Sequence, residues 1–181
     1  MNPAGPAGDE LAERLMRLVR DVPDFPLPGV LFKDIMPLLA DGPTLAAVVD
    51  HIVGAHRAAD FHVVAGIEAR GFLLAGPIAY AAGCGVVAIR KAGKLPGRVL
   101  STSYQLEYGE GVLELQRAAL APGQRVLLVD DVLATGGTMA AALALIASAG
   151  AVVAGVAVLI ELIDLAGRER LPMDVAALLS V

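Results

Sequence analysis

The stretch RVLLVDDVLATGGT, residues 125–138, decides the fold of this chain. Four apolar residues are followed by two adjacent carboxylates, Asp130 and Asp131, and then by a loop of small residues that leads into an apolar segment. This order is typical of a buried strand whose carboxyl end presents polar side chains to a ligand, followed by a helix. We therefore expect a strand at 125–130, a loop, and a helix at 137–149.

The rest of the chain repeats this alternation of strand and helix. Apolar spacing predicts further helices at 9–21, from Thr44 onward and at 72–82, and further strands at 61–66, 85–90 and 151–160. Such alternation favours the α/β class, with a mainly parallel, twisted sheet and helices on both faces. Two segments depart from it: 24–39, which contains three prolines and a glycine, and the Gly/Pro/Ser-containing excursion 91–112.

Length and composition indicate a soluble protein of one domain. The 181 residues are 56% hydrophobic and 18% charged, as expected for strands covered on both faces. Residues 1–8 are expected to form a flexible tail, and no basic start precedes an apolar run, so we expect a cytoplasmic protein. The single cysteine, Cys84, excludes an internal disulfide and suits a reducing compartment.

The distribution of charged residues bears on two functional classes, nucleic-acid-binding proteins and membrane-associated proteins. The net charge of −5 disfavours broad nucleic-acid binding, whereas the local group Arg90, Lys91, Lys94 and Arg98 suits a small polyanion. No charged residue occurs in 132–160, and about 20 apolar residues would span a membrane. Glycines and polar residues interrupt this run, which favours a buried helix and strand. A membrane-associated protein is the alternative, and solubility without detergent would exclude it.

The residues of 125–138 suit a ribose phosphate. The carboxylates of Asp130 and Asp131 can accept hydrogen bonds from sugar hydroxyls or face a hydrated divalent cation. The small residues 134–138 would let backbone N–H groups surround a phosphate at a helix N-terminus. A turn with one capping residue would need neither two acids nor two glycines. The Gly-Lys-Ser/Thr of a Walker loop is missing.

The same stretch resembles the motif that binds phosphoribosyl diphosphate (PRPP) in type I phosphoribosyltransferases. Four other segments, in compatible order, narrow the resemblance to the adenine phosphoribosyltransferase family: DFPLPGVLFKDI (24–35), GIEARGFLLAGPIA (66–79), IRKAGKLPG (89–97) and SYQLEYG (103–109). The resemblance covers about residues 10–165. It implies a small N-terminal hood that binds the base with 24–39, and a flexible catalytic loop, 91–112, over the site.

The resemblance also implies a role for particular residues. Ribose would be held by Asp130 and Asp131, and its 5-phosphate by Ala134, Thr135, Gly136, Gly137 and Thr138. Pyrophosphate would contact Arg70, Arg90, Lys91 and Lys94, and adenine would contact Leu31, Phe32 and Lys33. Glu107 would be the general acid or base. Many family members carry Arg at the Lys33 position, and in many the peptide bond after the Glu68 position is cis.

The implied reaction is purine salvage: adenine and PRPP give AMP and pyrophosphate. Mg²⁺ would be the cofactor, held by PRPP and water rather than directly by protein ligands, and the chain would form a homodimer without nucleic-acid or membrane partners. Two alternatives keep the fold. One is a phosphoribosyltransferase for another nucleobase, and the other is a non-catalytic sensor of PRPP or nucleotides. A sensor predicts a basic DNA-binding appendage, which the sequence does not contain.

Overall fold

The computed structural model describes residues 6–106 and 109–181 of the chain. Contacts between residues divide it into two compact units, one ending at His51 and the other beginning at Ile52. Within the described residues, no helix combines the length and the apolar character needed to cross a membrane.

The first unit joins helices to a two-stranded sheet. Its elements are α1 (Pro6–Leu18), β1 (Arg20–Val22), β2 (Phe32–Asp34), α2 (Met36–Ala40) and the larger part of α3 (Gly42–His56). The strands pair antiparallel, with Val22 opposite Phe32. The predicted helix 9–21 is wrong at its end, because the helix stops at Leu18 and residues 20–22 pair with 32–34. Pro23 contributes to this, since a residue before proline disfavours helical backbone.

The second unit is built on a seven-stranded sheet with the order β5-β6-β4-β3-β7-β8-β9. The strands are β3 (Val63–Ile67), β4 (Gly85–Lys91), β5 (Val99–Leu106), β6 (Gly109–Gln116), β7 (Arg125–Leu133), β8 (Val152–Glu161) and β9 (Ala176–Ser180). Strands β4, β3, β7, β8 and β9 run parallel, whereas β5 and β6 continue the sheet antiparallel from β4. The prediction of a mainly parallel sheet is confirmed.

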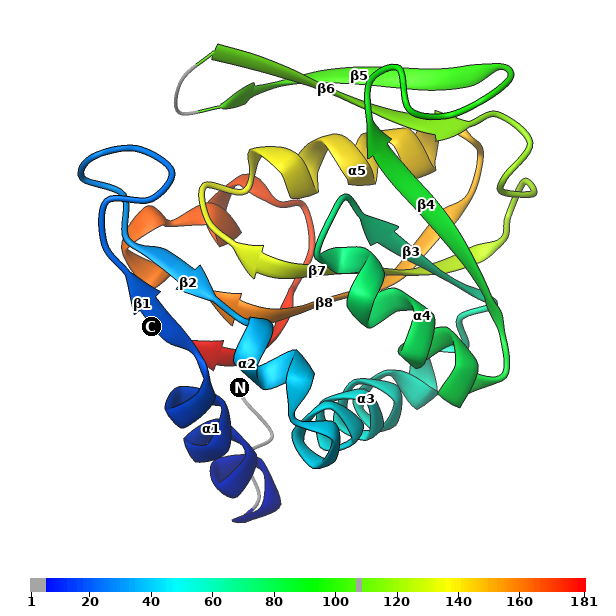
Figure 1. Ribbon diagram of the computed structural model, residues 1–181. Coiled ribbons are helices and arrows are strands. Elements are labelled where there is room, and N and C mark those ends of the chain that lie inside the picture. The colour runs from blue at the N-terminus through cyan, green and yellow to red at the C-terminus, as the bar shows by residue number, and fades with distance from the viewer. Residues whose placement is uncertain (1–5, 107–108) are drawn as a thin grey trace. The chain divides into compact units, whose positions relative to one another are not determined.

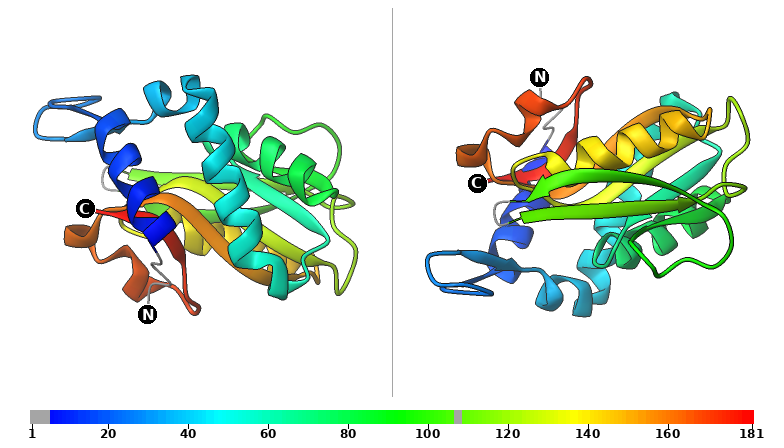
Figure 2. Two further views of the ribbon diagram at one scale, coloured as in Figure 1. Left: turned by 90° about the horizontal axis from the view of Figure 1, so that it is seen from below. Right: turned by 90° about the horizontal axis from the view of Figure 1, so that it is seen from above.

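Helices cover both faces of this sheet, as expected. Figures 1 and 2 show α4 (Gly71–Ala82) on one face and α5 (Gly137–Ser148) on the other, with β5 and β6 curling over α5. Between α5 and the strands lies the hydrophobic core, which includes Ile67, Leu113, Leu128, Leu145 and Val158. Short 3-10 turns at Arg57–Ala59, Ile163–Leu165 and Gly167–Arg170 complete the unit.

The sequence did not predict three strands of this sheet, β5, β6 and β9. Much of the excursion 91–112 is a β-hairpin, formed by β5 and β6, and the C-terminal tail contains β9. Each pairs with a strand elsewhere in the chain: Arg90 lies opposite Glu114, and Ala176 opposite Ala157. Strand β7 also continues past the predicted end at 130, so that Asp130 and Asp131 lie within it.

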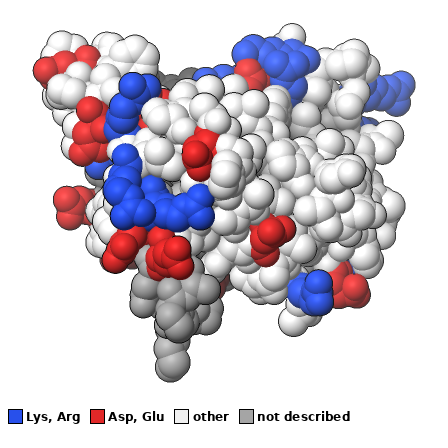
Figure 3. All heavy atoms as spheres, turned by 60° about the horizontal axis from the view of Figure 1, so that its bottom comes forward, with Lys and Arg blue, Asp and Glu red and all other residues white. Residues whose placement is uncertain are grey.

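Charged side chains of both signs are mixed on one face of the molecule. In Figure 3, Lys and Arg side chains lie next to Asp and Glu side chains instead of forming a continuous basic stripe across the described part of that face. Nucleic-acid binding surfaces normally carry such a stripe. The group Arg90, Lys91 and Lys94 is instead local and lies at the end of β4 and in the loop that follows it.

Candidate functional site

The predicted site residues of the second unit lie at the carboxyl ends of three adjacent strands. Because β3 lies between β4 and β7 and runs parallel to both, the loops that follow these strands meet at one edge of the sheet. The loop after β3 carries Glu68 and Arg70, β4 ends in Arg90 and Lys91, and β7 leads into 134–136. This topology brings the acidic pair and the basic group to the same edge.

The acidic pair contacts the loop after β3. Asp131 Oδ2 lies 2.7 Å from Arg70 Nε, and the Asp131 side chain is only 6% exposed. This ion pair is the contact of Asp131 Oδ2, which accepts no well-aligned hydrogen bond among the described residues. Asp130 Oδ1 accepts a hydrogen bond from the Asp131 amide at 2.9 Å. A Cβ atom on Gly71 would lie 2.9 Å from Asp130 Oδ1, so glycine lets α4 begin close to β7.

Ionisation of the two carboxyls carries an electrostatic cost. Burial, and after it the charge of Asp131, raises the pKa of Asp130 well above its usual range. Burial also raises the pKa of Asp131, although the charge of Arg70 acts in the opposite direction. A ligand that brings hydroxyl donors or a cation to this pair would favour the ionised form of both acids.

The loop after β7 forms a cradle for an anion. Gly136 is the residue before α5 and has a φ of 81°, a left-handed conformation that glycine adopts without strain. Helix α5 begins at Gly137, and its first backbone N–H groups have no partner within the helix. These N–H groups and the positive end of the helix dipole suit a phosphate. The structure therefore brings Asp130, Asp131 and residues 134–138 together, as expected.

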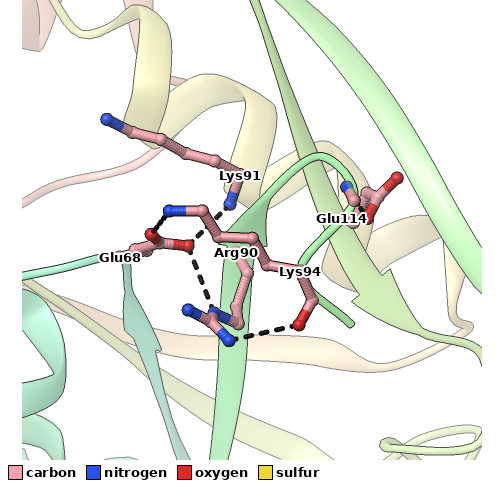
Figure 4. Close-up of polar contacts among 6 residues, drawn as sticks. Glu68, Arg90, Lys91, Lys94 and Glu114 are labelled. Atoms are coloured by element: carbon pink, nitrogen blue, oxygen red, sulfur yellow. Dashed lines mark hydrogen bonds and ion pairs between the residues drawn. The ribbon is translucent and has the colours of Figure 1, made fainter. Parts of the chain in front are cut away.

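The basic group is organised by Glu68, a residue that the sequence analysis left without a role. Figure 4 shows its carboxylate between Arg90 and Lys94. Glu68 accepts hydrogen bonds from Arg90 Nε at 3.2 Å, from the Lys91 amide at 3.0 Å, and from Lys94 Nζ. The Lys94 carbonyl in turn accepts a hydrogen bond from Arg90 Nη1 at 3.1 Å. The Lys91 side chain points away from Glu68 (Figure 4).

These contacts keep Glu68 ionised. Burial alone would raise the pKa of Glu68, but hydrogen bonds from Lys94 and the Lys91 amide, with the charges of Lys94 and Arg90, lower it overall. The Arg90 guanidinium also lies 5.9 Å from the centre of the Phe72 ring, in a cation–π contact. The sequence offered one signal for this arrangement, which is an acid two residues before Arg70, in the loop that follows a strand.

The peptide bond between Glu68 and Ala69 is cis. This is the state that the resemblance suggested and that the sequence could not determine.

The residues expected to contact adenine belong to the first unit. The Phe32 and Phe25 rings pack edge to face, with centroids 5.1 Å apart and planes at 78°. Lys33 Nζ forms an ion pair with Asp21 Oδ1 at 2.7 Å, and Leu31 is half exposed. Their proposed role and that of Glu107, which lies outside the described residues, stay predictions.

The donor set suits a weakly held magnesium ion. In the described ranges, no group of three His, Cys, Asp or Glu side chains is arranged to hold a metal. Mg²⁺ commonly takes one or two carboxylates and otherwise binds phosphate oxygens and water. Asp130 and Asp131 beside an anion cradle fit that pattern for a hydrated ion, because Arg70 already pairs with Asp131 Oδ2 and leaves few protein oxygens for direct ligation.

Parallel strands that deliver an acidic pair, an anion cradle and a basic group to one edge define a protein of the phosphoribosyltransferase class. Residues 38–176 match the family model described as "Phosphoribosyl transferase domain". The adenine phosphoribosyltransferase of Clavibacter michiganensis subsp. michiganensis is 57% identical over 180 residues, which are 99% of each chain. The chain belongs to the adenine phosphoribosyltransferase family.

Solved structures agree with this family. Adenine phosphoribosyltransferase from Rhodothermus marinus DSM 4252 is similar with a TM-score of 0.92 and 44% identity, over 96% of this chain and 99% of that one. The enzyme from Saccharomyces cerevisiae, in complex with D-2,5-dideoxy-2,5-imino-altritol 1,6-bisphosphate and adenine, is similar with a TM-score of 0.89 and 35% identity, over 94% of this chain and 99% of that one.

Proposed function

We propose that this protein transfers the 5-phosphoribosyl group of PRPP to adenine, giving AMP and pyrophosphate in purine salvage. The observation that carries the proposal is the arrangement at one edge of the sheet, where the acidic pair and cradle of β7–α5 lie beside the basic group of β3–α4 and β4. PRPP contains a ribose and a phosphate at one end and a pyrophosphate at the other, and these two groups of residues match its two ends in chemistry.

The acidic pair and the cradle bind the ribose 5-phosphate in this proposal. Asp130 and Asp131 accept hydrogen bonds from the ribose hydroxyls, which compensates the cost of ionising two neighbouring carboxyls. Backbone N–H groups in 134–138, with the hydroxyls of Thr135 and Thr138, donate to the phosphate. This leaves C1′ oriented for attack, which supplies the positional part of the rate enhancement.

The basic group stabilises the leaving pyrophosphate. As the bond between C1′ and the pyrophosphate oxygen breaks, the electron pair leaves with pyrophosphate, whose negative charge grows. Arg90 and Lys94 are held in place by Glu68, and the exposed Lys91 is positioned by its backbone hydrogen bond to the same carboxylate. Arg70, anchored on Asp131, contributes a fourth cation. Cations positioned before the reaction stabilise such charge without further reorganisation.

Magnesium is the proposed cofactor. When bound, Mg²⁺ neutralises phosphate charge and favours departure of pyrophosphate. PRPP oxygens and water would hold the ion, and the carboxylates of Asp130 and Asp131 would face the hydrated cation without ligating it directly.

We assign recognition of the base to Leu31, Phe32 and Lys33. The Phe32 ring offers an aromatic surface for a purine, and the neighbouring backbone groups would read its edge. N9 of adenine forms the new bond to C1′ and loses its proton, which Glu107 would accept. We further propose a cytoplasmic homodimer, which light scattering on the purified protein would test.

The decisive experiment incubates the purified chain with PRPP and Mg²⁺ and, separately, with adenine, hypoxanthine, guanine or uracil. We expect AMP and equimolar pyrophosphate from adenine only. An Asp130→Ala, Asp131→Ala variant is the control, and it should form no nucleotide. Nucleotide formed from another base instead of adenine would overturn the substrate assignment. If no base gives nucleotide although the chain still binds PRPP, the proposed enzymatic function is wrong, and a non-catalytic sensor is favoured.

A further inference from the structure

The segment that follows β8 lies directly against the phosphate cradle. A Cβ atom built on Gly167 would collide with the Ala134 carbonyl and lie 2.9 Å from the Gly136 amide nitrogen. In the same way, a Cβ atom on Gly136 would collide with the Gly167 carbonyl. The backbones of the cradle and of the turn Gly167–Arg170 are therefore in direct contact, without side chains between them. Figures 1 and 2 show this orange segment next to the yellow loop that enters α5.

The next residue, Arg168, fixes the position of Gly167. Its guanidinium donates to both oxygens of Glu161, with Nε at 2.9 Å from Oε1 and Nη2 at 2.5 Å from Oε2. A third hydrogen bond runs from Nη1 to the Val175 carbonyl at 2.7 Å. Glu161 is the buried last residue of β8, and Val175 is a buried core residue just before β9. Arg168 therefore ties the turn to two neighbouring strands of the sheet.

We propose that Gly167 and Arg168 are positioning residues for the 5-phosphate of the substrate. Arg168 holds Gly167 against Ala134 and Gly136, and this contact sets where the first N–H groups of α5 point. The inference rests on the proposed function, because it concerns the cradle to which the ribose phosphate is assigned. It adds a second layer to the site that the family motif in 125–138 does not include.

Two features make the contact sensitive to substitution. Arg168 is 39% exposed, but its partner Glu161 is largely buried, so loss of Arg168 would leave that carboxylate without its cation and would release the turn. Two backbones in contact have no flexible side chain to absorb a shift, so an added methyl group at Gly167 must displace the cradle. The basic group is held by other contacts, those of Glu68 with Arg90 and Lys94, and is expected to keep its geometry.

The test measures binding of two probes to the full chain by calorimetry. Ribose 5-phosphate reports on the cradle, and magnesium pyrophosphate reports on the basic group. Gly167→Ala and Arg168→Gln should each weaken ribose 5-phosphate binding about tenfold or more, since a small misplacement of a positioned group has effects of this order. Pyrophosphate binding should change by less than about twofold, within ordinary variation of a few tenths of a kcal/mol.

Two further variants separate positioning from loss of fold. Arg168→Lys keeps the charge but cannot donate to both oxygens of Glu161 in the same way, so its affinity for ribose 5-phosphate should lie between those of wild type and Arg168→Gln. A general loss of folding would instead weaken the binding of both probes. Gly76→Ala, a glycine with open space around it, should leave both affinities unchanged. Thermal unfolding verifies that each variant is folded, and if Gly167→Ala is not, the two Arg168 variants decide.

Unchanged ribose 5-phosphate affinity in the folded variants, or an equal loss for both probes, would overturn the inference. Its failure is distinguishable from failure of the proposed function. If wild type binds ribose 5-phosphate but converts no base to nucleotide, the proposed enzymatic function is wrong. Calorimetry still tests separately whether ribose 5-phosphate binding depends on Gly167 and Arg168.

Discussion

Replacement of Glu68 by glutamine tests whether this carboxylate organises the basic group. The variant Glu68→Gln keeps the shape of the side chain and removes its charge. In the wild type, the 7% exposed carboxylate accepts from Arg90 Nε, the Lys91 amide and Lys94 Nζ. A neutral amide has one acceptor oxygen and an NH₂ group that cannot accept, so at least one of these donors loses its acceptor.

The expected cost follows from the three contacts. A hydrogen bond to a charged group contributes about 1.5–3 kcal/mol and a neutral one about 0.5–1.5 kcal/mol, so each contact loses about 1 kcal/mol. The Lys94 side chain is 47% exposed, and solvent screening reduces its share. The lower desolvation cost of an amide offsets part of the remainder. We expect a loss of about 2 kcal/mol in the free energy of unfolding, or about 4–8 °C in Tm for a domain of this size.

The difference between wild type and variant should depend on pH. The pKa of Glu68 is lower in the folded state than its ordinary value of 4.5. Its stabilising contribution is therefore complete above that value and is lost as the pH falls through the folded-state pKa. Urea unfolding at neutral pH and at a series of lower pH values should show the two midpoints converging at low pH.

Glu114→Gln is the matched control. Glu114 lies on β6, the strand that pairs with β4, and accepts a hydrogen bond from the Gly93 amide at 2.9 Å in an exposed position. Its replacement should cost less than about 1 kcal/mol. Equal stability of wild type and Glu68→Gln at neutral pH, or a difference that does not change with pH, would refute the role given to Glu68.

Three further predictions concern the proposed site. Asp130→Asn should raise the urea midpoint at neutral pH while abolishing AMP formation. Because the pKa of Asp130 is raised in the folded state, the wild type loses stability as the pH rises through that pKa, and the neutral amide avoids this loss. An unchanged urea midpoint at a pH above the folded-state pKa would contradict the electrostatic argument. Lys91→Ala should change stability by less than about 0.5 kcal/mol, because its side chain is exposed, and should weaken pyrophosphate binding measured by calorimetry. Lys33→Arg should leave the KM for adenine unchanged, because either cation can pair with Asp21; a large change would show that the side chain itself reads the base.

Local sequence was sufficient to predict the β7–α5 unit. The run Val126–Val129 is apolar throughout and buried, and Gly136 supplies the left-handed turn that starts α5. These features depend on residues that are close in sequence, so a pattern can reveal them. The parallel sheet followed from the alternation of such units, and the family followed from five ordered motifs, both of which are confirmed.

Strand pairing between distant segments was not predictable in this way. The excursion 91–112 contains few continuous apolar residues, yet 99–106 forms a strand because 109–116 pairs with it and with β4. Strand β9 similarly depends on β8. A polar strand is stabilised by hydrogen bonds to its neighbours, and the sequence does not name those neighbours.

The sequence by itself therefore determined which chemical groups are available: the acidic pair, the small-residue cradle and the cations. Only the tertiary structure decided their electrostatic state and their support. Asp131 forms an ion pair with Arg70, and Glu68 forms ion pairs with Arg90 and Lys94. Arg168 forms an ion pair with Glu161 and so holds the turn that contacts the cradle. The physical reason is that charge interactions and desolvation depend on distance and burial in space, and the parallel, side-by-side order of β4, β3, β7 and β8 sets both.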